Sequence, residues 1–185
     1  MPEHTGAERT GAPIPAGRPA AGEYASWFAA YVARVPGEDP LPALERQRVE
    51  WDGVLAGLDV ERGSFRYAPG KWSVLELAEH VVDTERILTT RALRIARGDP
   101  TPLPGFDQDI LVAGGNAARR PPGDVREEFD GLRRSGLALF RGFDARTWRR
   151  TGAADGAPVS VRALAFIVAG HADHHLQVLR ERYLR

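Results

Sequence analysis

Four of the five histidines in this chain fall in two short stretches, and imidazole is the commonest transition-metal ligand in proteins. His80 stands alone in the first stretch, and the second contains His171, His174 and His175. On a helix, His171 and His175 lie about 40° apart and one turn along the axis, so both can bind one ion from the same face. A nitrogen of His80 on a facing helix completes the set. The spacing therefore predicts one divalent metal ion held by His80, His171 and His175.

The alternative is that each histidine is an ordinary buried polar residue with its own hydrogen-bond partner. Three such rings in one core need three partners, since each unpaired buried polar group costs about 1–3 kcal/mol. One ion satisfies all three rings and keeps coordination positions open, as in catalytic metal sites. Two weaker candidates for a proton acceptor are His174, predicted at the rim, and Asp83, which either orients a ligand from one turn beyond His80 or is a surface acid.

The composition of the 185-residue chain excludes several other classes of function. There is no cysteine, which removes disulfides, thiolate ligands and cysteine nucleophiles. The 25 basic and 25 acidic side chains balance, so we expect no nucleic acid partner, and the arginine pair at 133–134 is predicted to be solvated surface. No signal-like or membrane-spanning apolar run is present, which predicts no membrane partner and a cytoplasmic protein.

The first 22 residues are rich in proline, glycine and alanine, which predicts a disordered tail at 1–22 followed by one domain at 23–185. A short leading helix is predicted over 24–35 from the spacing of its aromatic and aliphatic residues. Its aromatic face includes Trp27, Phe28 and Tyr31, and we expect this face to be buried in the core. The alternative is that it packs against a second subunit in a homodimer.

Four longer helices follow, and together they predict an all-α fold, a four-helix bundle. The second predicted helix covers about 41–59. The third covers about 74–97, with Ser73 and Glu76 forming a capping box at its start. A proline- and glycine-rich connection at 98–123 then lasts far longer than a usual helix–helix loop. Such a long crossover lets the helices on either side of it run parallel.

The remaining helices are predicted from their caps and their apolar spacing. Asp124 and Glu127 resemble a second capping box, at the start of a helix that buries Val125 and Phe129. A turn region at 151–158, read as a candidate hairpin, precedes Ser160, which is placed to cap a final helix that reaches nearly to the end of the chain.

The same segments resemble the DinB-like superfamily, in particular its DinB-like domain 2 branch, over roughly residues 24–185. The carrying stretches are YAPGKWSVLELAE at 67–79, HVVDTERILTTRALRIARGD at 80–99, LPGFDQD at 103–109 and VRALAFIVAGHADHHLQVLRERYL at 161–184. The resemblance implies four helices in up-down-down-up order. It also implies a divalent ion such as nickel or zinc on the histidines that match here, His80, His171 and His175.

The resemblance further implies a class of chemistry, because the family includes S-transferases that use bacillithiol, mycothiol or glutathione. Our first hypothesis is therefore a stress-response or detoxification enzyme in which the ion activates a low-molecular-weight thiol toward a small electrophile. A variant activates water for hydrolysis. The alternatives outside enzymes are a stress-associated metal-binding protein without turnover and a metal-free interaction scaffold.

Overall fold

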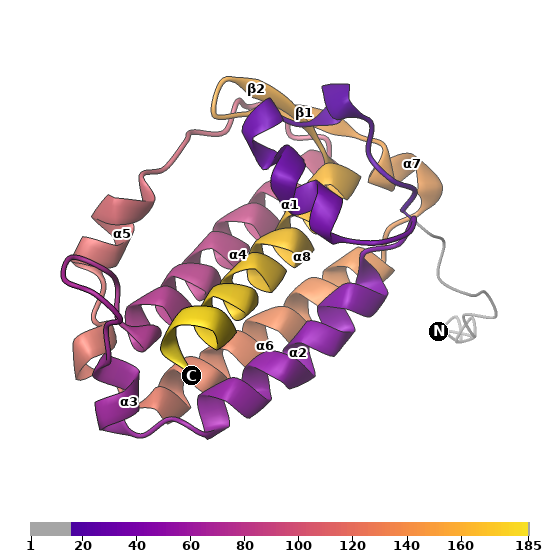
Figure 1. The fold of residues 1–185 in the computed structure, drawn as a ribbon. Coiled ribbons are helices and arrows are strands. Elements are labelled where there is room, and N and C mark those ends of the chain that lie inside the picture. Colours follow the sequence, from indigo (N-terminus) through magenta and orange to yellow (C-terminus); the bar gives the residue numbers. More distant parts are fainter. Residues whose placement is uncertain (1–15, 185) are drawn as a thin grey trace, which may run out of the picture.

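Four long helices form a bundle in the computed structural model, which describes residues 16–184 (Figure 1). They are α2 (Leu41–Ala56), α4 (Val74–Ala96), α6 (Pro122–Arg141) and α8 (Val161–Val178). The predicted all-α four-helix bundle is confirmed. No helix in this described part of the chain has the length and apolar character needed to span a membrane.

Shorter elements surround the bundle. Two 3-10 turns, Ala21–Glu23 and Ser26–Phe28, lead into α1 (Ala29–Arg34), so the leading helix is shorter than predicted. The others are α3 (Val60–Ser64), α5 (Gln108–Gly114), a 3-10 turn at Ala117–Arg119, α7 (Ala145–Trp148), the strands β1 (Thr151–Ala154) and β2 (Ala157–Ser160), and a π-helical turn at Leu179–Tyr183.

The long helices run in up-down-down-up order, as expected. Helices α4 and α6 are parallel, because Glu79 near the start of α4 pairs with Arg120 just before α6, and Thr89 further along α4 faces Gly136 of α6. The connection between them returns along the outside of the bundle through α5 (Figure 1). Antiparallel neighbours need only short loops, whereas this parallel pair needs a connection as long as the bundle.

Most helix boundaries agree with their predicted caps, and one does not. Ser73 and Glu76 form the expected capping box, and the Ser160 hydroxyl accepts a hydrogen bond from the backbone N–H of Ala163. The capping box predicted for Asp124 and Glu127 is wrong. Helix α6 begins two residues earlier, at Pro122, because proline has no N–H to satisfy and its fixed φ suits a first helical position.

The other ends of the predicted elements differ in smaller ways. Helix α2 ends at Ala56 rather than near 59, and the chain starts the separate helix α3 at Val60. The candidate hairpin is real, since β1 and β2 pair antiparallel around Asp155 and Gly156, both at positive φ. Residues 1–15 of the predicted tail lie outside the described residues, whereas Ala16 is buried and Arg18 donates hydrogen bonds to two backbone carbonyls of the leading helix region.

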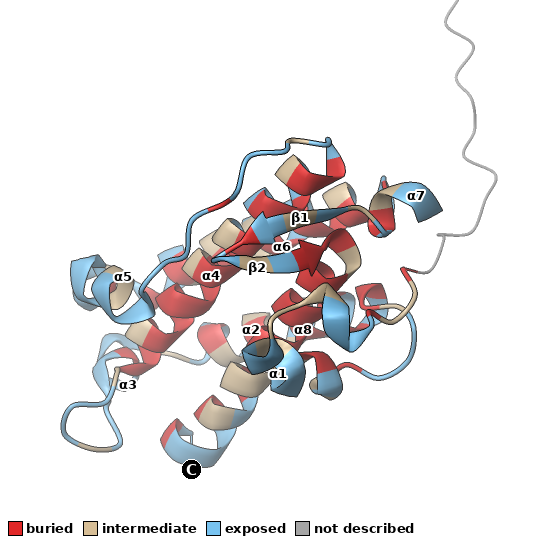
Figure 2. Ribbon diagram, turned by 90° about the horizontal axis from the view of Figure 1, so that it is seen from above, coloured by how far each residue is buried: buried red, intermediate tan, exposed pale blue. Residues whose placement is uncertain are grey.

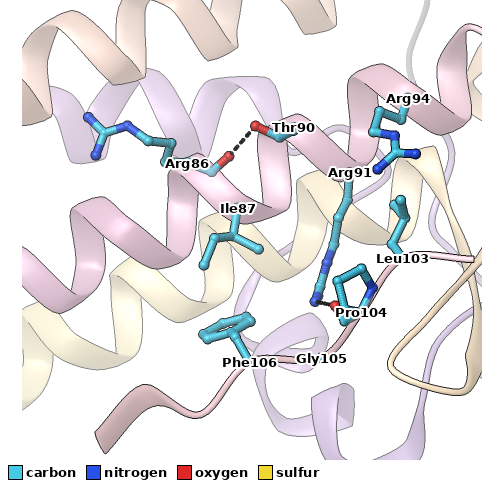
Figure 3. Close-up of a pocket in the computed structure, with 9 residues that line it drawn as sticks. All are labelled: Arg86, Ile87, Thr90, Arg91, Arg94, Leu103, Pro104, Gly105 and Phe106. Atoms are coloured by element: carbon cyan, nitrogen blue, oxygen red, sulfur yellow. Dashed lines mark hydrogen bonds between the residues drawn. The ribbon is translucent and has the colours of Figure 1, made fainter. Parts of the chain in front are cut away.

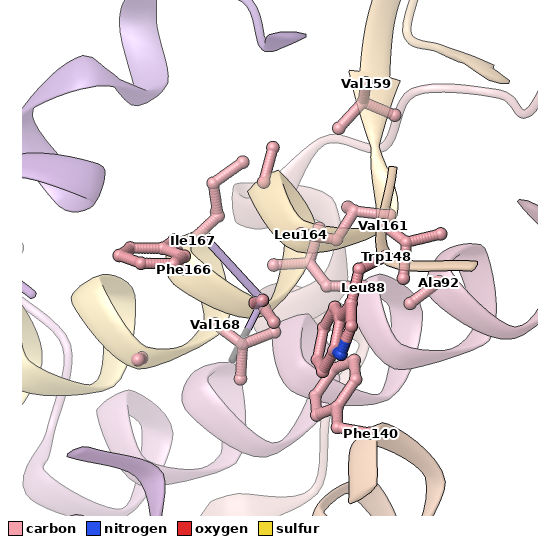
Figure 4. Packing of buried hydrophobic residues seen from close by; sticks show 14 of the residues in the cluster. Leu88, Ala92, Phe140, Trp148, Val159, Val161, Leu164, Phe166, Ile167 and Val168 are labelled. Atoms are coloured by element: carbon pink, nitrogen blue, oxygen red, sulfur yellow. The ribbon is translucent and has the colours of Figure 1, made fainter. Parts of the chain in front are cut away.

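Two apolar clusters fill the bundle, one toward each end. The cluster at the hairpin end includes Leu88, Phe140 and Leu164, whose side chains pack together in Figure 4. The cluster at the other end includes Trp51 and Leu176. The inner faces of the long helices are accordingly buried, while α5 lies outside the bundle and is largely exposed (Figure 2).

A layer of buried polar side chains separates the two clusters. At its centre, Arg133 of α6 makes two hydrogen bonds of 2.7 Å to the carboxylate of Glu85 on α4. The same guanidinium donates to the carbonyl of Leu44 and the side-chain oxygen of Gln47 on α2, and the amide of Gln47 donates to the carbonyl of Ala169 on α8. One arginine thus ties all four long helices together.

The burial of Arg133 corrects the expectation that the 133–134 arginine pair is solvated. Arg133 is 1% exposed, whereas the side chain of Arg134 is 68% exposed. A helical wheel contains a signal for this difference: Arg133 lies one turn after Phe129 beside the buried stripe of α6, whereas Arg134 lies on the side opposite Val125.

We predict that Arg133→Met lowers the free energy of unfolding by about 3–5 kcal/mol, because it leaves the Glu85 carboxylate buried without its cation. The matched control is Arg134→Met, which removes an exposed charge from the next position and should change stability by less than about 0.5 kcal/mol. Urea denaturation of both variants measures the difference. Equal effects of the two substitutions would contradict the assigned role of the buried pair.

Candidate metal centre

The three histidines predicted as ligands converge inside the bundle. His80 comes from α4, and His171 and His175 come from one face of α8. The Nε2 atom of His171 lies 3.0 Å from that of His80 and 3.1 Å from that of His175. His80 is 3% exposed and His171 is 6% exposed, so the nitrogens meet away from bulk water.

Hydrogen bonding among the rings cannot satisfy these nitrogens. The Nε2 atom of His171 faces two other Nε2 atoms, yet an imidazole nitrogen has either one hydrogen to donate or one lone pair to accept with. One ion fits the three lone pairs: at bonds of about 2.1 Å, two nitrogens at right angles around it are about 3.0 Å apart and two at the tetrahedral angle about 3.4 Å apart. The observed separations lie at the right-angle end of this range.

Burial keeps these imidazoles neutral and therefore able to donate lone pairs. Desolvation lowers the pKa of His80 to about 4. The pKa of His175 falls to about 3, first through desolvation and then through the neighbouring His80 and His174. Desolvation also holds the pKa of His171 well below its usual value. A cluster of neutral imidazoles at neutral pH is the form that binds a divalent metal.

The two weaker candidates lie in different surroundings. The ring of His174 packs edge-on against Tyr31 and against His175, at centroid distances of 5.6 and 4.9 Å, so it stands beside the triad at its rim as expected. Asp83 belongs to a charged cluster instead. The Arg86 guanidinium lies 3.5 Å from its carboxylate, and burial together with the nearby carboxylate of Glu79 raises the pKa of Asp83.

One hollow of about 290 Å³ opens onto the triad from the side of α1, and we call it the first hollow. Aromatic rings of the leading segment face polar side chains of α4 across it. Its walls are made by Trp27, Phe28, Tyr31, His80, Thr84, Arg91, Phe106, Gln108, Asp155 and His171.

Sequence reasoning missed Thr84 and Arg91 in this wall, although a helical wheel contains a signal for both. They follow His80 by 4 and 11 residues, so they lie within about 40° of it on α4. Asp155 carried no such signal, because the hairpin is far from the histidines in sequence.

A second hollow of about 310 Å³ reaches His175, and the second hollow includes His174 as well. Its walls are made by Tyr67, Gly70, Lys71, Trp72, Leu77, Asp109, His174, His175, Val178 and Tyr183. Asp83 lines neither hollow. The first hollow is thus lined by His80 and His171 of the triad, and the second by His175.

Close backbone packing places α1 against the triad. A Cβ atom on Gly170 would lie 1.9 Å from the carbonyl oxygen of Tyr31, so only glycine lets α1 approach α8 this closely. This approach sets the Tyr31 ring edge-on to His171, with 5.4 Å between centroids. The leading segment thereby forms one wall of the first hollow.

Comparison with known proteins agrees with this architecture. The sequence profile of the DinB superfamily matches residues 43–179, which include all four histidines of the centre. The chain belongs to the DinB superfamily. A comparison with curated proteins finds no match for this DinB-superfamily chain.

A solved structure from Bacillus subtilis has the same fold as this DinB-superfamily chain. YfiT is described as "a probable metal-dependent hydrolase with an unusual four-helix bundle topology". The two superpose with a TM-score of 0.70 over 88% of this chain and 89% of that one, at 14% sequence identity. The likeness extends over the bundle and its up-down-down-up order.

We predict that the metal-free protein loses stability as the pH falls below 6.5. Because the folded-state pKa of His80 is about 4 and that of His175 about 3, the unfolded chain binds protons that the folded triad does not. The free energy of unfolding should fall by up to about 1.4 kcal/mol per pH unit for each histidine. Urea denaturation of chelator-treated protein between pH 7 and 5 measures this slope.

The control for the pH slope is His80→Gln, which removes one of the buried imidazoles. Its unfolding free energy should depend less steeply on pH than that of the wild type. An identical slope in the two proteins would show that the triad is not the origin of the pH dependence.

Proposed function

We propose that this chain is a metal-dependent enzyme in which His80, His171 and His175 hold one divalent ion, nickel or zinc. The observation that carries the proposal is the convergence of three buried Nε2 atoms that cannot satisfy one another, on histidines that line two hollows. A structural tie between helices needs no such openings. Three protein ligands with open access are typical of a catalytic metal site.

The reaction we propose first is hydrolysis of a small molecule. A bound ion of this kind lowers the pKa of a coordinated water and polarises a substrate carbonyl. The fold relative YfiT, described as a probable metal-dependent hydrolase, supports this choice. In this proposal the aromatic rings of the first hollow would bind the substrate, and water would enter through the second hollow.

His174 is the proposed proton acceptor for this reaction. It lines the second hollow beside His175. Desolvation lowers its pKa, so at pH 7 the ring is neutral and has a free lone pair that can accept a proton. Asp83 is a poorer candidate, because it lines neither hollow and lies in its own charged cluster.

A second candidate reaction is transfer of a low-molecular-weight thiol to a small electrophile, with a role in detoxification under stress. The presence of two hollows favours it, since a thiol and an electrophile could reach the triad by different openings. The absence of cysteine means that the sulfur would come from the cofactor. A homodimer is compatible with either reaction: Trp27 on the leading segment is 59% exposed and could meet a second subunit.

We predict that untagged protein purified without chelator contains near one nickel or zinc ion per chain, and that His80→Ala, His171→Ala and His175→Ala each lose it. Each variant leaves only two imidazoles, too few to hold the ion through purification. Elemental mass spectrometry gives the content. The matched control is His174→Ala, which should keep the ion but lower turnover by about 100-fold or more if this ring moves the proton.

Assays with activated esters, and with a haloarene in the presence and absence of added thiol, separate the two reactions. Ester turnover without thiol supports hydrolysis, and turnover of the haloarene only with thiol supports S-transfer. A stoichiometric ion without any turnover would favour the stress-associated metal-binding protein. No ion even after reconstitution would remove the basis of the proposal.

A further inference from the structure

Arg91 is a buried cation that forms no salt bridge with any described residue. It is 6% exposed, and desolvation lowers the pKa of its guanidinium. Its hydrogen bond in the described part of the chain goes to the carbonyl of Pro104 at 2.5 Å, and it lies over the ring of Phe106 at 5.4 Å from the centroid (Figure 3). Burying a charge without a salt bridge costs free energy, which indicates that this guanidinium has a role other than stabilising the fold.

Its surroundings differ from those of Arg133, the other buried arginine. The guanidinium of Arg133 donates its hydrogen bonds to Glu85 and to α2, and Arg133 lines neither the first nor the second hollow. Arg91 uses one donor on the Pro104 carbonyl and lines the first hollow together with His80. The remaining donors of its planar fork are therefore available to a ligand in that hollow.

The rest of the wall is flat and apolar. Trp27, Phe28 and Tyr31 contribute rings from the leading segment, and Phe106 contributes one from the long connection. Such walls accommodate a planar or unsaturated carbon skeleton. Arg91 follows His80 on the same face of α4 about three turns further along, so a ligand anchored at the arginine extends toward the triad.

We propose that the first hollow is the binding site for a small carboxylate, with its acid group held by Arg91 and its apolar body held between the aromatic rings. The inference rests on the proposed function in one respect, since it takes the far end of this ligand to be the part that the triad acts on. The proposed reactions, hydrolysis and S-transfer, do not specify a substrate class, and this inference assigns one: small carboxylates.

The charge of the hollow favours a carboxylate over a doubly charged phosphate. Asp155 lines the same hollow and raises the pKa of Arg91, but it forms no salt bridge with that arginine, so the guanidinium still has donors for an acid group. One further negative charge is matched by the guanidinium, whereas a second would be opposed by the aspartate. The fork of an arginine also fits the two oxygens of a carboxylate.

The test uses 3-phenylpropionate and 3-phenylpropionamide, which have the same shape and differ in charge, titrated into the protein as isolated. Calorimetry gives the dissociation constants, and the emission of Trp27 in the wall provides a second readout. We expect the acid to bind about tenfold more tightly than the amide. Arg91→Gln should remove that preference, whereas Arg91→Lys, which keeps the charge but not the planar fork, should retain part of it.

The matched control is Arg94→Gln, which removes the same charge from α4. Arg94 pairs with Asp99 and does not line the first hollow, so this variant should bind the acid like the wild type. Because Arg91 also bonds to the Pro104 carbonyl, Arg91→Gln could disturb the fold; Arg91→Lys keeps a charged donor at this position and tests the site with less change.

Three results would overturn the inference. The first is equal affinity of the wild type for the acid and the amide, and the second is an equal effect of Arg91→Gln and Arg94→Gln on acid binding. The third is that His171→Ala loses acid binding while Arg91→Gln retains it. The last result would assign the acid group to a bound ion instead of the arginine. Failure of the proposed function is distinguishable from these, since a protein without turnover could still bind the acid selectively through Arg91.

Discussion

The buried guanidinium of Arg133 is the constraint on which the bundle depends. A charge at 1% exposure persists only where every donor finds an acceptor, and here the acceptors come from Glu85 on α4 and from Leu44 and Gln47 on α2. Apolar side chains tolerate small shifts of one helix along another, whereas these directional bonds do not. The network therefore fixes the axial register of the long helices at one level.

That register brings the histidines together. The carbonyl of Ala169, which accepts from Gln47, precedes His171 by two residues, and Glu85 follows His80 by five. The triad thus lies close to the arginine layer, between two apolar clusters that exclude water. Burial has two effects on the imidazoles: it keeps them neutral, and it leaves their nitrogens in need of a common partner. The same low-dielectric surroundings strengthen any interaction with an ion or an acid group in the hollows.

The long connection between α4 and α6 is a consequence of their parallel arrangement and a source of both hollows. Its return path carries Phe106 and Gln108 into the first hollow and Asp109 into the second. The carboxylate of Glu79 accepts backbone hydrogen bonds from this connection, including one of 3.1 Å from Ala117, and so fixes it beside His80. A segment required by topology has become part of the site.

The sequence by itself determined the four long helices, the caps at Ser73 and Ser160, the long crossover and the face of α8 that carries His171 and His175. These follow from local rules, because a cap and a helical face depend on residues within a turn or two. The metal ligands remain a prediction, but their common face and the clustering of His80 with them could be anticipated.

Contacts between distant segments set the pairing of Arg133 with Glu85, the close approach of α1 to α8 at Gly170, and the hollow that Thr84, Arg91 and Asp155 share with the triad. A helical wheel gives the direction of a side chain but not the depth at which it ends or what stands opposite. Arg133 meets its partner 48 residues away and Gln47 meets Ala169 at a separation of 122, so the free energy of these contacts is absent from any local window. Burial of charge, and the hollows that such burial leaves open, are therefore properties of the packed chain.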